Sequence, residues 1–382
     1  MTPSAPPGWG QSLSTGAAGI ALAHAVDARA GSGDLATVHT WVSAMTREPV
    51  LAHPEACGLF HGAPAVAYTL HTAARPEYVK ALNTLDEHIT GLTRARLDAA
   101  RQRAESGVHP RMVEFDLISG LTGIGAYLLH RHGGGDLLRR VLDYVVRLTE
   151  PLRVGGQVLP GWWTSDGTDG RPSADGGHAN LGMAHGITGP LALTSTAALH
   201  NITVAGQTEA IQRISAWLDF WQRGTEEAPW WPETISRSEE RHGIIAQSGP
   251  GRPSWCYGTP GMARARQLAA LALDDPLAQR KAEKAMSACL ADEQQLAQLG
   301  DVSLCHGWAG LVHCAGRMAA DAQHDGGAIA ACLSTLRQRL DRRVEHRIPA
   351  SPGLLEGRAG IQLTRSTTTG TPTWDTCLLL AG

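Results

Sequence analysis

The sequence predicts an all-α fold built from seven helical hairpins. Three observations lead to this prediction. A short Gly-x-x-Gly element recurs along the 382 residues, an apolar segment rich in Ala and Leu follows each copy, and few windows alternate apolar and polar residues as a strand does. The first glycines stand at positions 16, 62, 120, 186, 258, 307 and 357, and the copy at 62 is weaker because Ala65 replaces its second glycine. The mean repeat is therefore about 57 residues long, which suits a helical hairpin with its loops.

Each repeat predicts one buried and one half-exposed helix. The segments after the glycines, such as residues 19–25 and 123–129, are apolar almost all round, which is typical of a buried helix. The stretches 75–103 and 276–296 mix charged residues with Leu and Ala at helical spacing. Such pairs either stack as an open solenoid or close into a ring. No terminal repeat is polar enough to cap a solenoid, which favours the ring.

The glycines and two long loops have structural interpretations. At the entry to a helix the first glycine permits a positive φ and a close backbone approach, and the second lets neighbouring helices come close. A phosphate-binding loop would need a strand before it, which the sequence does not predict. Segments 155–180 and 222–255 are irregular and contain Trp pairs, so we expect long ordered loops. Their tryptophans either line a peptide groove or anchor the loops.

The composition excludes several classes of protein. With 33 basic against 36 acidic residues, the net charge of -3 gives no basic surplus for binding nucleic acid. No apolar run reaches the roughly 20 residues that span a membrane. Residues 1–10 lack the basic start and apolar core of a secretion signal. Seven cysteines cannot pair fully within the chain, so we expect free thiols and a cytoplasmic location.

The residue directly before the first glycine is polar in every repeat. If each of these residues starts a buried helix, all seven side chains lie at the same end of a ring and converge. Buried polar groups cost free energy unless they are satisfied, so seven of them in one place indicate a functional site. The seven residues are Thr15, His61, Ser119, His185, Tyr257, His306 and Glu356.

A candidate metal site lies one and two positions before the glycine. Cysteine occurs two positions before it only in consecutive repeats, as Cys256 and Cys305, and His306 follows Cys305 directly. Equivalent positions on neighbouring hairpins are close in space. Two thiolates and an imidazole suit zinc and leave a fourth position open, as in catalytic zinc sites. The alternative is two buried thiols beside a hydrogen-bonded histidine; the repeat favours the metal.

Three further residues each have two interpretations. Asp116, four positions before Gly120, is either a helix cap or an acid of the site. His185 is either a site residue or a hydrogen-bonded histidine of the core. Arg252, in a loop of Gly and Pro, is either a solvated charge or a contact for an anion.

Three segments carry a resemblance to a known family. They are residues 254–261 (SWCYGTPG), 304–310 (LCHGWAG) and 180–186 (NLGMAHG). Together they resemble the lanthionine synthetase C-like proteins, the lanthipeptide cyclases, and the likeness covers essentially the whole chain. It implies one domain over residues 1–382, an α/α toroid of seven inner and seven outer helices with zinc at one end. It also implies Cys256, Cys305 and His306 as zinc ligands and Asp116, His185, Arg252, Trp255 and Tyr257 as active-site residues.

The family reaction is intramolecular thioether formation in a peptide whose Ser or Thr a dehydratase has converted to dehydroalanine or dehydrobutyrine. A zinc-bound peptide thiol is deprotonated and adds to the β-carbon. His185 is our first candidate for the acid that protonates the enolate, and Asp116 for orienting a base or accepting the thiol proton; these roles could be exchanged. Arg252 and Tyr257 would stabilise negative charge.

The resemblance also implies partners, and other functions compete with it. The partners are the dehydrated precursor peptide, with its core and leader, the dehydratase and other members of a synthetase complex. One rival is zinc-promoted addition of glutathione or another thiol to electrophilic sites. A second is a zinc-stabilised scaffold without chemistry. A third, a toroid glycosidase or terpene cyclase, needs paired carboxylates or Asp-rich motifs, for which Glu356 and Asp116 are a poor substitute.

Overall fold

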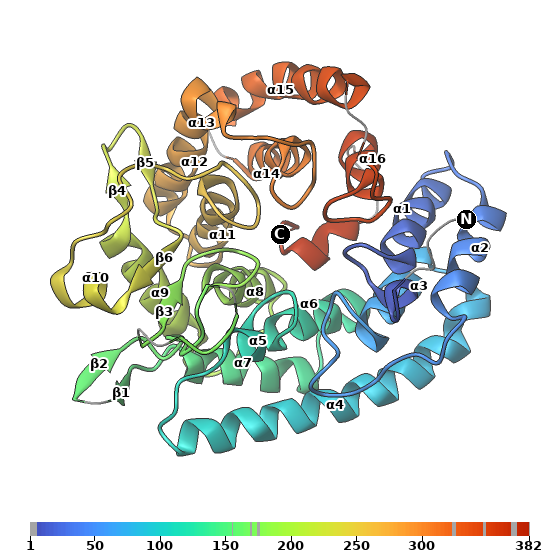
Figure 1. Ribbon diagram of the computed structural model, residues 1–382, viewed down its shortest axis with the longest axis horizontal. Coiled ribbons are helices and arrows are strands. Elements are labelled where there is room, and N and C mark those ends of the chain that lie inside the picture. Colours follow the sequence, from blue (N-terminus) through green and yellow to red (C-terminus); the bar gives the residue numbers. More distant parts are fainter. Residues whose placement is uncertain are drawn as a thin grey trace.

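Seven inner helices stand around the centre of the molecule (Figure 1). The computed structural model describes residues 6–154, 156–168, 170–173, 176–322, 326–346, 349–367 and 373–381. Within these residues, each repeat supplies one inner helix that begins one or two residues after its first glycine. The inner helices are α1 (Ala17–Arg29), α3 (Ala63–Ala73), α6 (Leu121–His132), α8 (Thr188–Leu199), α11 (Thr259–Ala272), α14 (Trp308–Asp321) and α16 (Arg358–Ser366).

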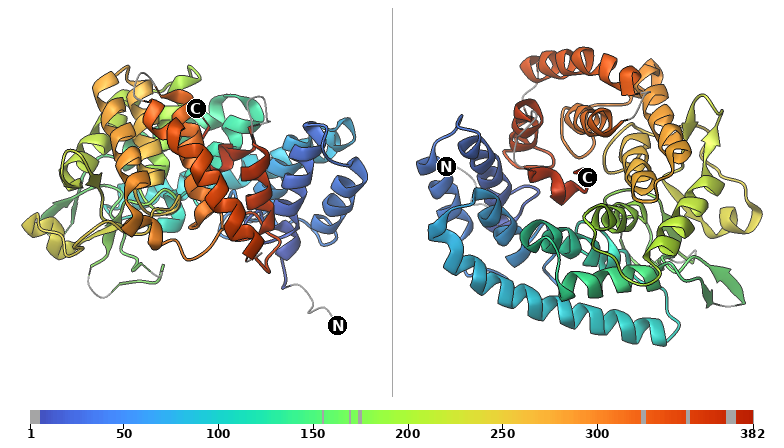
Figure 2. Two further views of the ribbon diagram at one scale, coloured as in Figure 1. Left: turned by 90° about the horizontal axis from the view of Figure 1, so that it is seen from above. Right: turned by 180° about the vertical axis from the view of Figure 1, so that it is seen from behind.

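Long outer helices surround the inner ones, as both face-on views show (Figures 1 and 2). Each outer helix packs against the inner helix of its own repeat, and each inner helix packs against those of the two neighbouring repeats. Because α16 also packs against α1, the ring closes. The predicted all-α toroid is therefore confirmed. In the described residues the outer helices are α2 (Leu35–Met45), α4 (Val79–Glu105), α7 (Asp136–Leu148), α9 (Gln207–Trp221), α12 (Pro276–Ala291) and α15 (Gly326–His346).

A closed ring of backbone hydrogen bonds joins the seven loops that enter the inner helices. In each loop the residue two positions before the first glycine accepts a bond from an N–H group of a neighbouring loop, with N–O distances of 2.8–3.4 Å. The ring holds equivalent positions of all seven repeats at one end of the toroid. The donor and acceptor pairs are Leu13 and Phe60, Phe60 and Ile118, Leu117 and Ala184, Met183 and Cys256, Cys256 and Cys305, Cys305 and Leu355, and Leu355 and Ser14.

The repeated glycines serve close packing more than unusual backbone conformation. Among the seven first glycines only Gly62 and Gly258 have a positive φ, of 76° and 110°. At the other five the close backbone approach, and not a positive φ, is what requires glycine. The second glycine lies against the carbonyl oxygen six residues before it, and a Cβ atom there would stand only 2.1–2.7 Å from that oxygen. The neighbouring repeat also touches this position, as predicted: a Cβ on Gly360 would lie 2.8 Å from Leu304 Cβ.

The seventh repeat ends differently from the other six. After α16 the described chain re-enters the ring as a short 3₁₀ helix, η3 (Trp374–Leu378), and the C-terminus lies at the centre in Figure 1 and in the right view of Figure 2. Leu378, Leu379 and Leu380 are fully buried there. The described residues contain six outer helices where the resemblance implied seven, because the chain after α16 turns to the centre of the ring. The apolar side chains of this C-terminal segment fill the space that seven inner helices enclose.

Short strands hold the two long loops. The pairs are all antiparallel: β1 (Leu152–Val154) with β2 (Gln157–Leu159), β3 (His178–Asn180) with β6 (Thr234–Ser236), and β4 (Arg223–Gly224) with β5 (Pro229–Trp230). Trp163 and Trp231 are buried, and their indole N–H groups donate to backbone carbonyls of Gly176 and Leu218. These two tryptophans therefore anchor the loops and do not line a groove. Short helices complete the described chain: η1 (Trp9–Gln11), η2 (Pro76–Tyr78), α5 (Met112–Phe115), α10 (Arg237–His242) and α13 (Glu293–Ala297).

Two predictions drawn from composition can be compared with the structure. All seven cysteines lie in the described residues, and each is a free thiol, as predicted. None of the helices in the described part of the chain combines the length and the apolar character that a membrane span requires.

Candidate metal centre and active site

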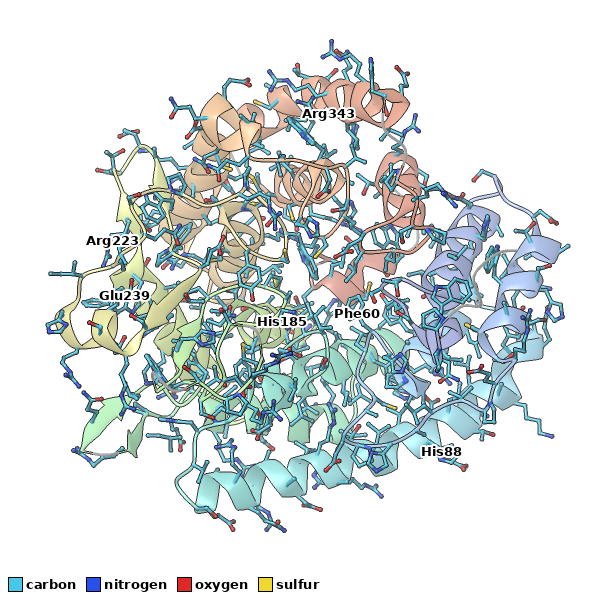
Figure 3. The ribbon with its side chains drawn as sticks, viewed as in Figure 1. Phe60, His88, His185, Arg223, Glu239 and Arg343 are labelled. Carbon is cyan, nitrogen blue, oxygen red and sulfur yellow. The ribbon has the colours of Figure 1, made fainter. Side chains whose placement is uncertain are left out.

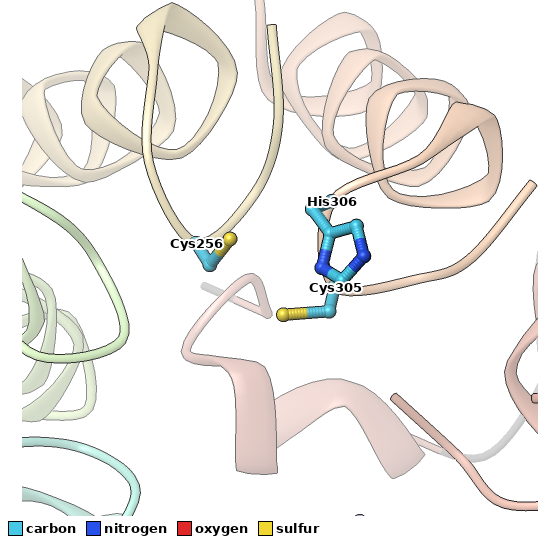
Figure 4. Close-up of side chains that lie close together, drawn as sticks. All are labelled: Cys256, Cys305 and His306. Carbon is cyan, nitrogen blue, oxygen red and sulfur yellow. The ribbon is translucent and has the colours of Figure 1, made fainter. Parts of the chain in front are cut away.

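Cys256, Cys305 and His306 meet at one end of the toroid, as the repeat predicts (Figure 4). Cys256 lies in the loop that enters α11, and the other two lie in the loop that enters α14. One ligand atom from each residue lies within 4.8 Å of those of the other two. The Cys256 N–H group donates to the Cys305 carbonyl at 3.2 Å. The backbone ring itself therefore sets the spacing between the two thiols.

The turn behind Cys256 depends on a glycine that no other residue replaces without strain. Gly258 has a φ of 110°, and a Cβ atom there would lie 2.3 Å from the Arg252 carbonyl oxygen. Ser254 lies inside the same turn, and its hydroxyl stands 3.7 Å from the Cys256 sulfur. The turn thus brings Arg252 and Ser254 back toward the metal ligands.

The two thiols differ in acidity in the metal-free protein, because one donates a hydrogen bond to the other. A hydrogen bond from the Cys305 thiol, together with those from His306 and Ser254, outweighs burial and lowers the pKa of Cys256 well below its usual value. The pKa of the Cys305 thiol is raised in turn by its bond to Cys256 and by burial. Hydrogen bonds with Asp301 and Cys256 raise the pKa of His306 to about 10. The hydrogen bonds within the group therefore favour the thiolate form of Cys256 over that of Cys305.

This donor set fits zinc. Two thiols and one imidazole are the soft and borderline ligands that zinc takes, and their close approach needs no change of fold. Burial around Cys256 and Cys305 limits competition from water. The three residues supply three ligands, so a fourth position is left for a substrate atom.

His185 and Asp116 form a hydrogen-bonded pair near the centre of the ring, where Figure 3 labels His185. The Asp116 side chain is 1% exposed and that of His185 is 39% exposed. One carboxylate oxygen of Asp116 lies 2.6 Å from His185 Nδ1, and the other accepts the N–H groups of Ser119 and Gly120. Asp116 thus fixes the backbone of the loop that enters α6, without capping the helix, and is a partner of His185 at the same time.

The environment of His185 favours its charged form. Burial opposes that form, but the hydrogen bond to Asp116 and the charges of Asp116 and Cys256 outweigh burial, so the pKa of His185 lies above its ordinary value. Because Nδ1 faces Asp116, the exposed edge of the ring carries Nε2.

Tyr257 stands beside the metal ligands and is fixed by Asn180. The Asn180 amide donates to the Tyr257 hydroxyl at 2.9 Å, and burial raises the pKa of Tyr257 to about 12. Its ring lies so close to Gly182 that a Cβ atom there would stand 2.7 Å from it. The hydroxyl is therefore a neutral hydrogen-bonding group with a fixed position.

Arg252 and Trp255 have different surroundings. The Arg252 Nε atom is buried and has no hydrogen-bond partner among the described residues. The positive charge of Arg252 lowers the pKa values of both Cys305 and His306, so it acts at the metal ligands. Trp255 is fully buried, and its indole N–H group donates to the Leu378 carbonyl at 3.1 Å. The structure thus shows Trp255 packed against the C-terminal segment, and its assignment as an active-site residue stays a prediction.

The seven polar residues before the first glycines surround the mouth of the toroid. They are half-buried or exposed, which corrects the expectation of a buried polar ring. A groove of about 790 Å³ opens beside two of them, His306 and Glu356. Arg342 and Arg343 line it from α15, and Figure 3 labels Arg343 on that helix. The groove thus reaches from the surface to His306, one of the three candidate metal ligands.

Comparisons with known proteins agree with this geometry. Residues 7–379 match the model of the family described as lanthionine synthetase C-like protein. The chain belongs to the lanthionine synthetase C-like family. Nisin biosynthesis protein NisC of Lactococcus lactis subsp. lactis is 24% identical over 262 residues, which cover 66% of this chain and 60% of that relative. The solved structure of nisin cyclase shares the fold, with a TM-score of 0.80 and 21% identity over 98% of this chain and 93% of that one.

This lanthionine synthetase C-like chain has two site residues that sequence reasoning did not single out. Asn180 holds Tyr257, and Asp301 holds His306 with an O–N distance of 3.2 Å. Both stand six positions before a first glycine, and so does Arg252. The register that located the cysteines therefore also contained a signal for these residues.

Proposed function

We propose that this protein is a zinc-dependent lanthipeptide cyclase. It adds peptide Cys thiolates to the dehydroalanine or dehydrobutyrine of a dehydrated precursor and so forms lanthionine or methyllanthionine rings. The observation that carries the proposal is the position of the Cys256, Cys305 and His306 group beside the His185 and Asp116 pair at one end of the toroid. Membership of the family and the names of its relatives support the same activity.

The three ligands would hold one zinc ion. When bound, zinc would lower the pKa of a peptide thiol that joins them, so that the thiol reacts as the thiolate. Arg252, whose Nε atom has no partner among the described residues, places a positive charge next to this position. Its charge would attract the incoming thiolate and hold it near the dehydrated residue.

His185 is the group that we assign to proton transfer. Addition of sulfur to the β-carbon forms the C–S bond and moves the electron pair of the double bond toward the α-carbon, which must then take up a proton. The raised pKa of His185 provides that proton near neutral pH, and Nε2 is the atom that faces away from Asp116. Asp116 accepts three hydrogen bonds already, so its role is to orient His185 and stabilise its charge.

Tyr257 is the second group that would contact the reacting peptide. Asn180 donates to its hydroxyl oxygen, so the hydroxyl proton is free to point elsewhere. That proton would bind the carbonyl oxygen on which negative charge develops. The groove beside His306 would admit the peptide chain.

The proposal extends to partners and location. The substrate would be the precursor peptide with its leader and core, after a dehydratase has acted on it, and other members of a synthetase complex would assist. We propose that the protein works in the cytoplasm, where its free thiols stay reduced.

The decisive test compares Cys305→Ala with Cys289→Ala, a buried thiol in α12 that serves as the matched control. Zinc content is measured by elemental analysis, and cyclisation of a dehydrated peptide by mass spectrometry after alkylation of the remaining thiols. We expect Cys305→Ala to lose zinc and cyclisation together, because two ligands cannot replace three. Cys289→Ala should retain both.

Two results would contradict the proposal. One is a zinc-free Cys305→Ala protein that cyclises at the wild-type rate. The other is a wild-type protein that forms only adducts with added glutathione and no rings, which would favour addition of small thiols instead.

A further inference from the structure

Asp301 is held against the only histidine among the three metal ligands. It lies in the loop that enters α14, five residues before His306, and its Oδ2 atom stands 3.2 Å from His306 Nε2. The other oxygen, Oδ1, accepts the Ser303 N–H group at 2.7 Å. A Cβ atom on Gly307 would lie 2.2 Å from Oδ1, so the first glycine of this repeat makes room for the carboxylate.

The two nitrogens of His306 face different partners. The Asp301 carboxylate stands 3.2 Å from Nε2, and the ring also brings a nitrogen within 4.8 Å of the Cys256 and Cys305 sulfurs. Figure 4 shows one ring nitrogen on the side of the two sulfur atoms and the other on the far side. Since Nε2 faces Asp301, Nδ1 faces the sulfurs. The chain thus offers Nδ1 to a metal and Nε2 to a carboxylate.

We infer that Asp301 is a positioning residue for the metal centre. Its carboxylate accepts the Nε2–H group of His306 and so keeps the Nδ1 lone pair directed at the metal. A neutral imidazole carries one N–H group, and only its other nitrogen can be a ligand. A carboxylate at Nε2 selects the tautomer that the metal needs and strengthens Nδ1 as a donor. This inference rests on the metal site of the proposed function.

Among the charged side chains near His306, Asp301 is the one placed to accept its Nε2–H group. Glu356 also lines the groove beside His306, but within the described part of the chain it makes no hydrogen bond or ion pair with the histidine. Arg252 is positive and disfavours a charged His306. The backbone bond from Ser303 fixes Asp301, so its carboxylate is in place before a metal arrives.

The test measures zinc affinity directly in the full-length protein. The variants are Asp301→Asn and Asp301→Ala, and the matched control is Asp292→Asn, another carboxylate that accepts backbone N–H groups two and three residues later. Competition with a chromophoric chelator gives the zinc dissociation constant. Thermal unfolding of the zinc-free proteins reports any purely structural effect.

We expect Asp301→Asn to weaken zinc binding about 10- to 100-fold, the usual effect of losing such a partner. Asn donates an N–H to Nε2 and so stabilises the wrong tautomer, which Ala does not, so Asn should weaken binding at least as much as Ala. Asp301→Glu keeps the charge and should recover most of the affinity. In the cobalt-substituted protein the visible absorption should shift in Asp301→Asn and not in the control.

Two outcomes overturn the inference. Zinc affinity of Asp301→Asn within twofold of wild type would show that His306 needs no carboxylate. The second outcome is a loss of zinc affinity that is accompanied by a lower melting temperature of the zinc-free protein and is not recovered in Asp301→Glu. It would assign Asp301 a structural role only. Failure of the proposed function is a separate result, because there the wild-type protein itself would bind no zinc or form no rings.

Discussion

At the scale of single residues, the site consists of reactive groups that backbone hydrogen bonds hold in place. One oxygen of Asp116 accepts the N–H groups of Ser119 and Gly120, and the other contacts His185. In the same way, one oxygen of Asp301 accepts the Ser303 N–H group, and the other contacts His306. Each carboxylate therefore has one oxygen fixed by the backbone and one that orients a histidine. The site is preorganised because these contacts do not depend on a substrate.

Replacing Asp116 should change the pH profile as well as the rate. The charge and hydrogen bond of Asp116 raise the pKa of His185, so Asp116→Asn should lower it. If His185 acts as the acid, activity is lost as pH rises through its pKa, and the alkaline limb of kcat should move to lower pH in the variant. We expect kcat to fall by about 10²- to 10⁴-fold, the usual contribution of a positioned acid.

Zinc content and the full pH profile of kcat test this prediction together. Zinc should remain bound in Asp116→Asn and in His185→Ala, because neither residue belongs to the ligand group. An alkaline limb that does not move would exclude His185 as the proton donor. Loss of zinc in His185→Ala would place that residue among the ligands instead.

The predicted metal ligands, with His185 and Tyr257, stand one or two positions before a first glycine, whereas Asp116, Arg252 and Trp255 were predicted at other positions of the same loops. Cys256, Cys305 and His306 could be found because the repeat aligns them, and the backbone ring is the physical reason. Asn180 and Asp301 were missed because their roles depend on which side chain each loop places next to them. The burial of Trp255 depends on a distant segment, which no local pattern reveals.

At the scale of elements, the second glycine, which six of the seven repeats have, is where an inner helix contacts its own entry loop. A Cβ atom on Gly360 would lie 2.1 Å from the Leu354 carbonyl oxygen and 2.8 Å from Leu304 Cβ in the neighbouring repeat. The same position therefore couples a helix to its own loop and to the next hairpin. This contact explains the repeat better than backbone freedom does, since most first glycines have ordinary φ values.

Gly360→Ala should destabilise the fold, and Gly316→Ala should not. The added methyl at position 360 forces the backbone and Leu304 apart, which costs about 1–3 kcal/mol in well-packed interiors. Gly316 lies inside α14, and no described atom lies within 4 Å of the place that an added methyl would take, so Ala there should raise helix stability by up to about 1 kcal/mol. Chemical denaturation of both variants measures the difference. Equal stabilities would refute the packing explanation.

At the scale of the whole molecule, two features complete the toroid. The contact of α16 with α1 completes the ring of helices, and the C-terminal segment fills the centre. Tyr68 and Arg264 hold that segment through the carbonyls of Trp374 and Leu380, at 2.7 and 2.9 Å. The closed ring was predictable from seven repeats without polar caps. The central segment was not, because it lies outside the repeat and has no glycine register.

Trp255→Phe tests the link between the metal loop and this central segment. The variant leaves the buried Leu378 carbonyl without its donor, which costs about 1–3 kcal/mol. Trp221→Phe is the control, because Trp221 is equally buried and its indole N–H group has no partner among the described residues. We expect denaturant melts to show the larger loss of stability in Trp255→Phe, with zinc stoichiometry unchanged. A loss of catalytic rate without a loss of stability would instead place Trp255 among the substrate-contacting residues.

The ring of backbone hydrogen bonds keeps the seven entry loops in place although the repeats differ in length. Successive first glycines are as close as 46 residues, from 16 to 62, and as far apart as 72, from 186 to 258, yet each entry loop is joined to its two neighbours by the same kind of backbone hydrogen bond. The additional residues of the longest repeat form β4, β5, β6 and α10 at the periphery. A repeat can therefore lengthen outward, and acquire a new outer surface, while the inner edge that carries the two thiols and the imidazole keeps its geometry.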